Sequence, residues 1–252
     1  MKTFYDKIAK QLGGYGYADD GLVYRSEYPK ENPEEEFYKA VLRASGSDQK
    51  ALDIGCGDGI FSFRVAPSFA RIDGIDNSKE LIKIAQRKQS ELSVSTTHFI
   101  YGDASHMPYE DVRFDVAFNR RGPSFYKEYA RVLKTDGLYI EIGIGEQDAQ
   151  SLKNTFKRGQ GFGEWASRRI ERDTTNFSKN GLSAIRAEDY FYNEYYPSRE
   201  MFGIFLKGVP IFEDFDITKD AHLLEAYYSS HTTKNGEIEL ERHRVLYVLQ
   251  KQ

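Results

Sequence analysis

Cysteine is nearly absent from this sequence of 252 residues. The single cysteine, Cys56, excludes an intrachain disulfide and any zinc or iron–sulfur site built from several cysteines. Long apolar runs are missing as well. None approaches the roughly 18 residues that a membrane span needs, and the N-terminal MKTFYDKIAKQ lacks the apolar centre of a secretory signal. We therefore expect a cytoplasmic protein without a membrane-bound part.

An excess of basic residues is also missing. The net charge is -4 at pH 7, and the acidic excess lies within residues 1–150, whereas residues 151–252 are balanced. Neither part resembles a general nucleic-acid binder, so nucleic acid is an unfavoured partner, although these counts do not exclude it. The histidines His222, His231 and His243 lack metal-ligand spacing, and we expect no metal site.

Short apolar runs alternate with helical patterns between residues 50 and 145, which is typical of a parallel sheet with crossover helices. The patterns predict strands at 50–54, 71–76, 97–101, 114–118, 138–144, 181–193 and 237–250. They predict helices at 33–42, after the glycine-rich segment 55–59, after Asn77 or Ser78, and at 125–133, 198–206 and 218–228. A hairpin-like turn at 234–236 predicts that the last strand is antiparallel.

No Pro/Gly/Ser-rich linker divides the chain, so we interpret residues 1–252 as one domain. Within it we distinguish an N-terminal cap segment (1–45), a ligand-binding core (48–145), a C-terminal half with insertions (146–236) and the final strand (237–252).

The segment Asp53–Gly59 holds glycines at every second position after a buried strand. Glycines there let the backbone turn sharply and approach a ligand closely, and the helix that follows presents free N–H groups. Ile60 breaks the Gly-x-Gly-x-x-Gly pattern of pyrophosphate binders. Taken alone, such a turn is equally consistent with a plain structural turn.

Acidic residues follow the next two strands. Asp76 ends the second strand about 20 residues after the loop, where a carboxylate can accept hydrogen bonds from ribose hydroxyls. It could instead be an acid that favours the start of a helix. Asp103 follows the third strand and could accept from an adenine amino group. Because ligands of open α/β sheets bind outside the carboxyl ends of the strands, these loops predict an adenosine site without a pyrophosphate.

The ordered motifs LDIGCGDG, GIDNS, GDASHMPY, FDVAF and RVLKTDGLYI resemble those of class I S-adenosylmethionine-dependent methyltransferases, most closely the ubiquinone/menaquinone-biosynthesis type. The resemblance implies an α/β fold: a three-layer, Rossmann-like, seven-stranded and mostly parallel sheet with an antiparallel last strand, helices on both faces and cap elements over the acceptor site. It implies S-adenosylmethionine as cofactor, with S-adenosylhomocysteine as product. It assigns cofactor binding to Asp53, Gly55, Cys56, Gly57, Gly59, Asp76, Asn77, Gly102, Asp103, Ala104 and Asn119.

Two segments depart from the resembled pattern. Thr135-Asp136-Gly137 replaces the Pro-Gly-Gly of many relatives, at a surface turn remote from the site. Residues 119–123, NRRGP, differ from the Asn-Pro-Pro-Tyr type used on amide or exocyclic nitrogens, which disfavours methylation of a nucleobase amine.

Methyl transfer from a sulfonium is a direct in-line displacement, so a base is needed only if the acceptor must lose a proton. His106 is the best-placed imidazole, although a surface histidine is the simpler interpretation. Asn119, at the end of the fourth strand, would lie near the sulfonium and the acceptor. We interpret Cys56 as a small packed residue and Glu141 as a buried, paired carboxylate.

Aromatic residues make up 14% of the chain. The resemblance places the N-terminal segment and the region around the sixth strand over the acceptor, which makes Tyr17, Tyr24, Tyr192 and Tyr195 candidates for its wall; core packing is the alternative. Arg120 and Arg121 could bind an acidic acceptor, or belong with the arginines at 158–172 to a solvated face.

The favoured function is methyl transfer to a small molecule by a monomer or homodimer. An RNA or protein methyltransferase docking through the arginines at 158–172 is the alternative. A non-catalytic adenosyl-ligand-binding protein is a further one. A nicotinamide-dependent oxidoreductase is disfavoured by the glycine spacing.

Overall fold

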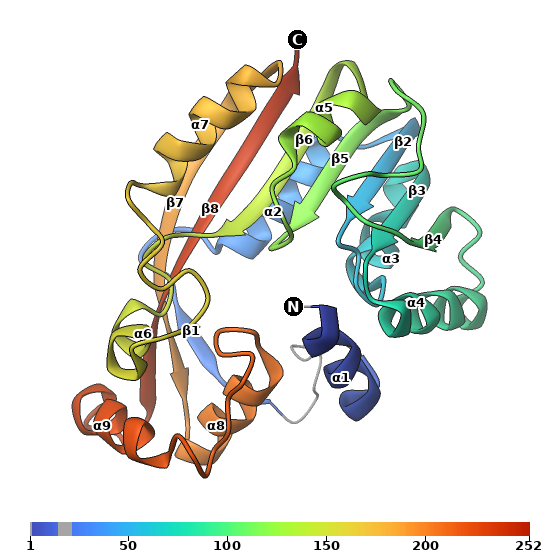
Figure 1. Cartoon of the computed structure of the whole chain (residues 1–252). Helices are drawn as coiled ribbons and strands as arrows, with labels where there is room; N and C mark the ends of the chain where they lie inside the picture. The colour runs from blue at the N-terminus through green and yellow to red at the C-terminus, as the bar shows by residue number, and fades with distance from the viewer. Residues whose placement is uncertain (1, 15–21) are drawn as a thin grey trace.

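A single mixed β-sheet runs through the protein (Figure 1). The computed structural model describes residues 2–14 and 22–252. Among these residues the strand order is β1-β7-β8-β6-β5-β2-β3-β4. The strands are β1 (Arg25–Glu27), β2 (Gly46–Ile54), β3 (Phe69–Asp76), β4 (Thr97–Tyr101), β5 (Phe114–Arg120), β6 (Leu133–Ile144), β7 (Leu182–Tyr196) and β8 (Ile238–Lys251).

The observed topology confirms the expected fold class. Strands β6, β5, β2, β3 and β4 pair in parallel, and β8 inserts antiparallel between β6 and β7. The sheet has one strand more than expected, because the short β1 pairs antiparallel with β7 from Arg25 opposite Tyr195. β6 also begins before its predicted start. The turn around Asp136, which has φ 61°, is a bulge within the strand, so pairing with β5 resumes after it.

Alternation along the strands sorts the core into two layers. Leu52 and Tyr139 lie in a hydrophobic cluster on one face of the sheet, whereas their neighbours Ala51 and Ile140 lie in a cluster on the other. α5 (Tyr126–Val132) and α7 (Arg169–Lys179) cover the first face. α2 (Pro33–Arg43) and α3 (Ile60–Val65), continued by the 3₁₀ turn η2 (Ala66–Ser68), cover the second. The result is the expected three-layer arrangement.

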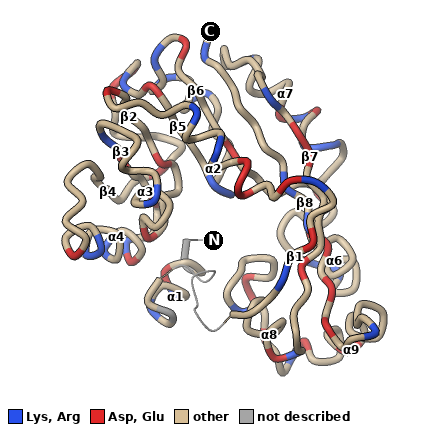
Figure 2. Tube along the Cα trace, turned by 180° about the vertical axis from the view of Figure 1, so that it is seen from behind, with Lys and Arg blue, Asp and Glu red and all other residues tan. Residues whose placement is uncertain are grey.

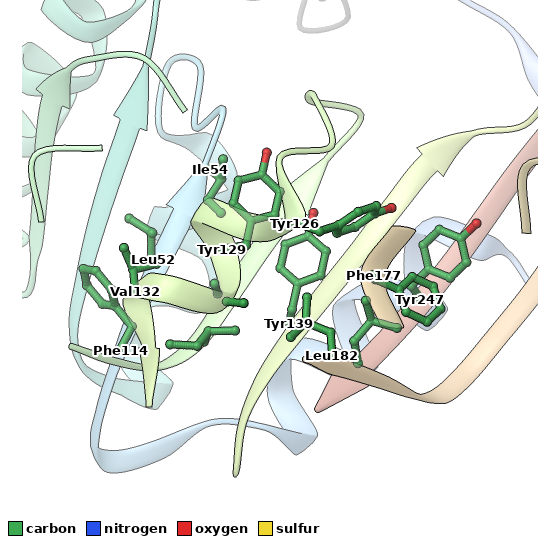
Figure 3. Packing of buried hydrophobic residues seen from close by; sticks show 14 of the residues in the cluster. Leu52, Ile54, Phe114, Tyr126, Tyr129, Val132, Tyr139, Phe177, Leu182 and Tyr247 are labelled. Carbon is green, nitrogen blue, oxygen red and sulfur yellow. The ribbon is translucent and has the colours of Figure 1, made fainter. Parts of the chain in front are cut away.

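Tyrosines account for much of the first layer, which Figure 3 shows from close by. The rings of Tyr129 and Tyr139 stack with centroids 5.0 Å apart, and the ring of Tyr126 meets that of Phe177 edge-on at 5.8 Å. Such pairs add roughly 0.5–1.5 kcal/mol each beyond the burial of their area. Part of the high aromatic content therefore packs between the sheet and its helices.

α4 (Lys79–Leu92) follows β3 and packs against β3 and β4. Its N-cap is Ser78, whose Oγ accepts a hydrogen bond from the backbone N–H of Leu81 at 3.2 Å. Of the two residues proposed for the cap, the structure thus selects Ser78. The same Oγ donates to Asp6 of α1 (Lys2–Leu12) at 2.5 Å, which ties the N-terminal helix to this edge of the domain.

The far ends of β7 and β8 extend past the rest of the sheet and carry α6 (Gln150–Phe156), α8 (Arg199–Gly208) and α9 (Ala221–His231) (Figure 1). We call these three helices, with the strand ends that they cover, the cap. Its core is a separate apolar cluster that includes Leu152, Phe202, Tyr227 and Leu240. In Figure 1, α1 lies between the cap and the β3–α4 edge of the sheet.

Buried charges lie where the cap meets the sheet, in a chain whose basic and acidic positions are otherwise interspersed (Figure 2). Asp148 accepts hydrogen bonds from Arg242 at 2.9 Å and from Arg244 at 2.5 Å. Burial alone would raise the pKa of Asp148, but the two guanidinium groups hold it well below its usual range. Breaking such a pair is costly, because one charge would remain buried without compensation.

Three helices had no counterpart in the sequence prediction: α1, α6 and α7. The buried positions of α7 include Arg169 and Asp173, so the helix shows no regular apolar stripe. Among the described residues, no helix is both long and apolar enough to cross a membrane.

Candidate active site

A cavity of about 600 Å³ lies at the carboxyl ends of β2, β3, β4 and β5. Side chains from α1, α6, α7 and the segment 160–165 complete its wall. Its volume is within the range of small-molecule sites, roughly 300–1,000 Å³. The parallel topology explains the position, because strands that run in one direction bring their following loops to the same edge of the sheet.

The glycine loop after β2 forms one side of the cavity. Gly55 and Gly57 line it and adopt left-handed backbone conformations, with φ of 74° and 55°. The backbone N–H groups of Gly55 and Cys56 both donate to the carbonyl of Ile75, at 2.8 and 3.1 Å, which fixes the loop against β3. A Cβ at Gly57 would meet nothing within 4 Å, so the loop presents bare backbone to open space.

Gly59 has a different role from the other loop glycines. It does not appear among the lining residues, and a Cβ there would come within 2.8 Å of the Phe99 ring. With φ 79° it is also the N-cap of α3. Gly59 therefore permits tight packing and the start of the helix, and it does not contact the cavity that the cofactor assignment requires.

Asp76, at the end of β3, lines the cavity and organises it. One carboxylate oxygen accepts from the N–H of Gly57 at 2.9 Å, and the other accepts from the N–H of Ser78 at 2.8 Å. Burial raises the pKa of Asp76, and these backbone donors oppose the rise. Because an ionised carboxylate has about four acceptor positions, two remain for a ligand. Asn77 lines the cavity beside it.

Asp53 lines the cavity from the end of β2 and is itself buried. Its carboxylate accepts from Ser62 Oγ at 2.6 Å. Burial raises the pKa of Asp53 to about 7, while the hydrogen bond from Ser62 acts in the opposite direction. Asp53 consequently changes charge near neutral pH, at a site that faces the ligand cavity.

The third acidic loop is more exposed. Gly102, Asp103 and Ala104 line the cavity after β4. Asp103 accepts from the backbone N–H of Ser105 at 2.8 Å, and this bond lowers the pKa of the carboxyl group. The side chain is therefore ionised at neutral pH and presented at the rim.

Cys56 lines the cavity only at the edge of a packed cluster with Ile82, Ala85 and Phe99. Burial raises the pKa of its thiol well above the usual value. A protonated, packed thiol is a poor nucleophile, which agrees with the interpretation of Cys56 as a packing residue.

Arg120 and Arg121 line the cavity at the end of β5, the strand next to β2 in the sheet. Both face the carboxylate of Glu34 in α2, at 4.0 and 3.2 Å. The structure thus brings these two predicted acceptor-binding residues into the same cavity as the acidic loops.

Asn119 precedes these arginines and is fully buried. Its Oδ1 accepts from the N–H of Gly122 at 2.8 Å, and its Nδ2 donates to the carbonyl of Pro123 at 2.7 Å. A Cβ at Gly122 would come within 2.5 Å of Asn119 Oδ1. Asn119 therefore shapes the loop that lines the cavity, and its own side chain does not appear among the lining residues.

Arg169, one of the arginines at 158–172 noted in the sequence, also lines the cavity. Its guanidinium donates to Asp173 at 2.9 Å, to the carbonyl of Ile144 at 2.8 Å and to Glu141. Glu141 is completely buried, as expected, and also accepts from Tyr139 at 2.9 Å. Burial raises the pKa of Glu141, while the charge of Arg169 lowers it.

Lys153 and Trp165 were missed in the sequence, and both line the cavity. Lys153 lies on α6 and is only 4% exposed. Trp165, the single tryptophan of the chain, carries the Arg172 guanidinium 4.4 Å from its ring centroid. A Cβ at Gly161 would come within 2.7 Å of the indole nitrogen, so the glycine-rich segment lets the ring pack closely. A lone tryptophan among glycines was the available signal.

Other predicted residues lie away from the cavity. His106 is exposed after β4, and its backbone N–H donates to the carbonyl of Asp103. Tyr24 stacks on Tyr196, and Tyr192 contacts the ring of Tyr28 at 4.9 Å. Tyr195 lies under the Arg25 guanidinium at 4.0 Å. An acceptor in this cavity would not meet these four side chains, and Tyr17 lies outside the described residues.

Comparison with known proteins decides the family. The methyltransferase domain family matches residues 45–186, more than half of the chain. The chain belongs to this family. Its resemblance to class I S-adenosylmethionine-dependent methyltransferases is thereby confirmed.

Individual relatives of this methyltransferase family match over shorter stretches. The uncharacterized methyltransferase YcgJ of Bacillus subtilis is 30% identical over 103 residues, which cover 38% of this chain and 41% of the relative. A demethylmenaquinone methyltransferase of Staphylococcus aureus is 31% identical over 130 residues, covering 47% of this chain and 53% of the relative. The chain thus spans about half the length of the curated relatives that it matches.

Solved structures share the fold of this methyltransferase domain. The crystal structure of YcgJ aligns with a TM-score of 0.63 at 19% identity, covering 86% of this chain and 99% of that one. The cyclase SpnF aligns with a TM-score of 0.62 at 19% identity, covering 99% and 94%. Because a cyclase shares the architecture, structural likeness at this identity establishes the fold and leaves the activity to the site.

Proposed function

We propose that this protein transfers a methyl group from S-adenosylmethionine to a small-molecule acceptor. The observation that carries the proposal is a single cavity with two chemically different parts. Three acid-bearing loops and bare glycine backbone form one part, after β2, β3 and β4. The other part continues past the β5 end to α6 and α7. Membership of the methyltransferase family supports this division into a cofactor part and an acceptor part.

The residues of the first part fit the cofactor. Asp76 would accept from the ribose hydroxyls with the two acceptor positions that its backbone bonds leave. Asp103 and Ala104 would contact the adenine at the rim. Asp53 and the backbone of Gly55 would face the methionine portion, whose ammonium group favours an ionised carboxylate nearby.

S-adenosylmethionine, when bound, supplies a methyl group on a positively charged sulfur. The contribution of this chain is then positional: it holds the acceptor atom in line with the methyl group and keeps water away. Such positioning can lower a barrier by roughly 7–11 kcal/mol. Asn119 supports it by holding the 120–123 loop in shape from below the cavity wall.

A macromolecular acceptor is less well supported. The arginines that would form its docking surface are engaged within the chain. Arg158 donates to Asp220 at 2.9 Å, Arg168 donates to Asp189, and Arg172 contacts Asp173 at 2.7 Å. Arginines that already face carboxylates offer little net charge to a phosphate backbone. Several relatives are named demethylmenaquinone methyltransferases, a name that describes a small-molecule acceptor and not a macromolecule.

Two measurements test the proposal. Isothermal titration calorimetry should show binding of S-adenosylhomocysteine and S-adenosylmethionine but not of NAD. Incubation with S-adenosylmethionine and pooled small metabolites should then release S-adenosylhomocysteine, whereas RNA or protein fractions should not. Absence of affinity for both adenosyl ligands would refute the proposal. Binding without turnover on any fraction would favour the non-catalytic alternative.

A further inference from the structure

Charge is divided along the cavity. The acidic lining residues are Asp53, Asp58, Asp76 and Asp103, and all four follow or end β2, β3 and β4. The basic lining residues are Arg120, Arg121, Lys153, Arg169 and Arg172, from the β5 end, α6 and α7. A cationic sulfonium suits the acidic part. The basic part lies where the proposed function places the acceptor.

The arginines of the basic part are largely compensated by carboxylates of the chain. Arg120 and Arg121 share the single carboxylate of Glu34. Arg169 and Arg172 both contact Asp173, and Arg169 also contacts Glu141. These contacts hold the guanidinium groups in place and leave only part of their charge for a ligand.

Lys153 differs from these arginines. It is 96% buried, and within the described part of the chain its ammonium group makes neither a hydrogen bond nor an ion pair, although its backbone N–H donates to the carbonyl of Ala149. The two carboxylates whose charge acts on Lys153, Asp148 and Glu241, already have other partners. Asp148 accepts hydrogen bonds from Arg242 and Arg244, and Glu241 accepts one from Ser151. Burial lowers the pKa of Lys153. A buried ammonium group without such a partner is unfavourable in the folded protein, and an anion would compensate it.

The surroundings hold this lysine at the cavity wall. A Cβ at Gly159 would come within 3.1 Å of Lys153 Cγ and 2.8 Å of the Phe212 ring, so glycine there makes room for the aliphatic stem. Trp165 also lines the cavity, where its ring offers a flat apolar surface.

We propose that the acceptor is a small organic anion, with a carboxylate or phosphate group, and that Lys153 binds this group. The inference rests on the proposed function, because it concerns the acceptor part of the same cavity. Lys153 is thus a specificity-determining residue: it selects acceptors by charge and fixes which end points away from the methyl donor.

The test uses the full chain saturated with S-adenosylhomocysteine. Calorimetric titrations compare 1-naphthoate and 1-naphthyl phosphate with the neutral 1-naphthamide, which has the same ring. The variant Lys153→Met keeps the length of the side chain and removes its charge. Lys207→Met, at an exposed lysine of α8, is the matched control. Affinity for S-adenosylhomocysteine is measured first in every protein.

We expect the wild-type chain to bind at least one of the two anions roughly tenfold or more tightly than the amide, as a charge-assisted hydrogen bond allows. Lys153→Met should lose this preference and keep its affinity for the amide and for S-adenosylhomocysteine. Its melting temperature should be unchanged or higher, because a buried charge is removed. Lys207→Met should behave as wild type. A preference for carboxylate over phosphate, or the reverse, identifies the anion.

Two results would overturn the inference. One is a wild-type chain that binds neither anion better than the amide, whatever the variants do. The other is a preference for the anion that survives in Lys153→Met. Failure of S-adenosylhomocysteine to bind would instead refute the proposed function, so the two failures are distinguishable.

Discussion

Asp76→Asn is the substitution that most directly tests how the glycine loop and the acidic loops form one cofactor site. Each carboxylate oxygen of Asp76 accepts one backbone N–H, from Gly57 at 2.9 Å and from Ser78 at 2.8 Å. Asparagine has the same shape but only one acceptor oxygen. Its amide nitrogen would face a backbone donor, so one loop bond is lost together with the negative charge.

The expected magnitude follows from these contacts. A hydrogen bond to a charged group contributes about 1.5–3 kcal/mol, which corresponds to a roughly 10- to 150-fold weaker binding of S-adenosylhomocysteine. The lost loop bond should lower the free energy of unfolding by about 1–3 kcal/mol, because a buried N–H is left without an acceptor. Burial already raises the pKa of Asp76 and so disfavours its charged form, which places the stability loss at the lower end.

Calorimetry with S-adenosylhomocysteine and urea unfolding measure the two effects separately. Asp73→Asn is the matched control: Asp73 is a buried carboxylate of the same strand, but it contacts Arg71 at 2.6 Å and Arg113 at 3.1 Å and does not line the cavity. That variant should lose stability and keep its affinity. An Asp76→Asn protein that folds and binds within twofold of wild type would refute the ribose assignment.

Three further predictions concern the same region. Burial raises the pKa of Asp53 to about 7, above its value near 4 in the unfolded chain, so the folded state holds an extra proton between these pH values and the free energy of unfolding falls as pH rises from about 4 to 7. The unfolding of Asp53→Asn, measured across this range, should lack this pH-dependent loss of roughly 4 kcal/mol. Identical pH profiles for the variant and the wild type would contradict the prediction. Gly59→Ala should lower the free energy of unfolding by about 1–3 kcal/mol, because position 59 has a left-handed φ and a Cβ there would contact the Phe99 ring. Urea titration measures this loss, and a neutral effect would mean that the Phe99 ring can move aside. Arg169→Met should lower the free energy of unfolding by about 3–5 kcal/mol, because Glu141 and Asp173 lose their buried cation. Urea unfolding at pH 7 measures this loss, and a variant as stable as the wild type would contradict it.

The sequence by itself determined the sheet and the cofactor part of the cavity. Short apolar runs specify the strands, and parallel order then brings Asp53, Asp76 and Asp103 to one edge of the sheet. Asp53 and Asp76 lie in the last two residues of their strands, and Asp103 lies two residues after its strand. Local pattern was therefore sufficient to place them at the cavity.

Apart from Arg120 and Arg121, only the tertiary structure decided which residues line the part of the cavity that we propose for the acceptor. Lys153 lies on the cap helix α6 and Trp165 lies in the segment 160–165, and both reach the cavity through the packing of the whole chain. The same long-range packing keeps Tyr192 and Tyr195 away from it, although the sequence pattern near the sixth strand favoured them. Contacts between residues far apart in the chain are set by how whole elements fit together, and no local spacing encodes that fit.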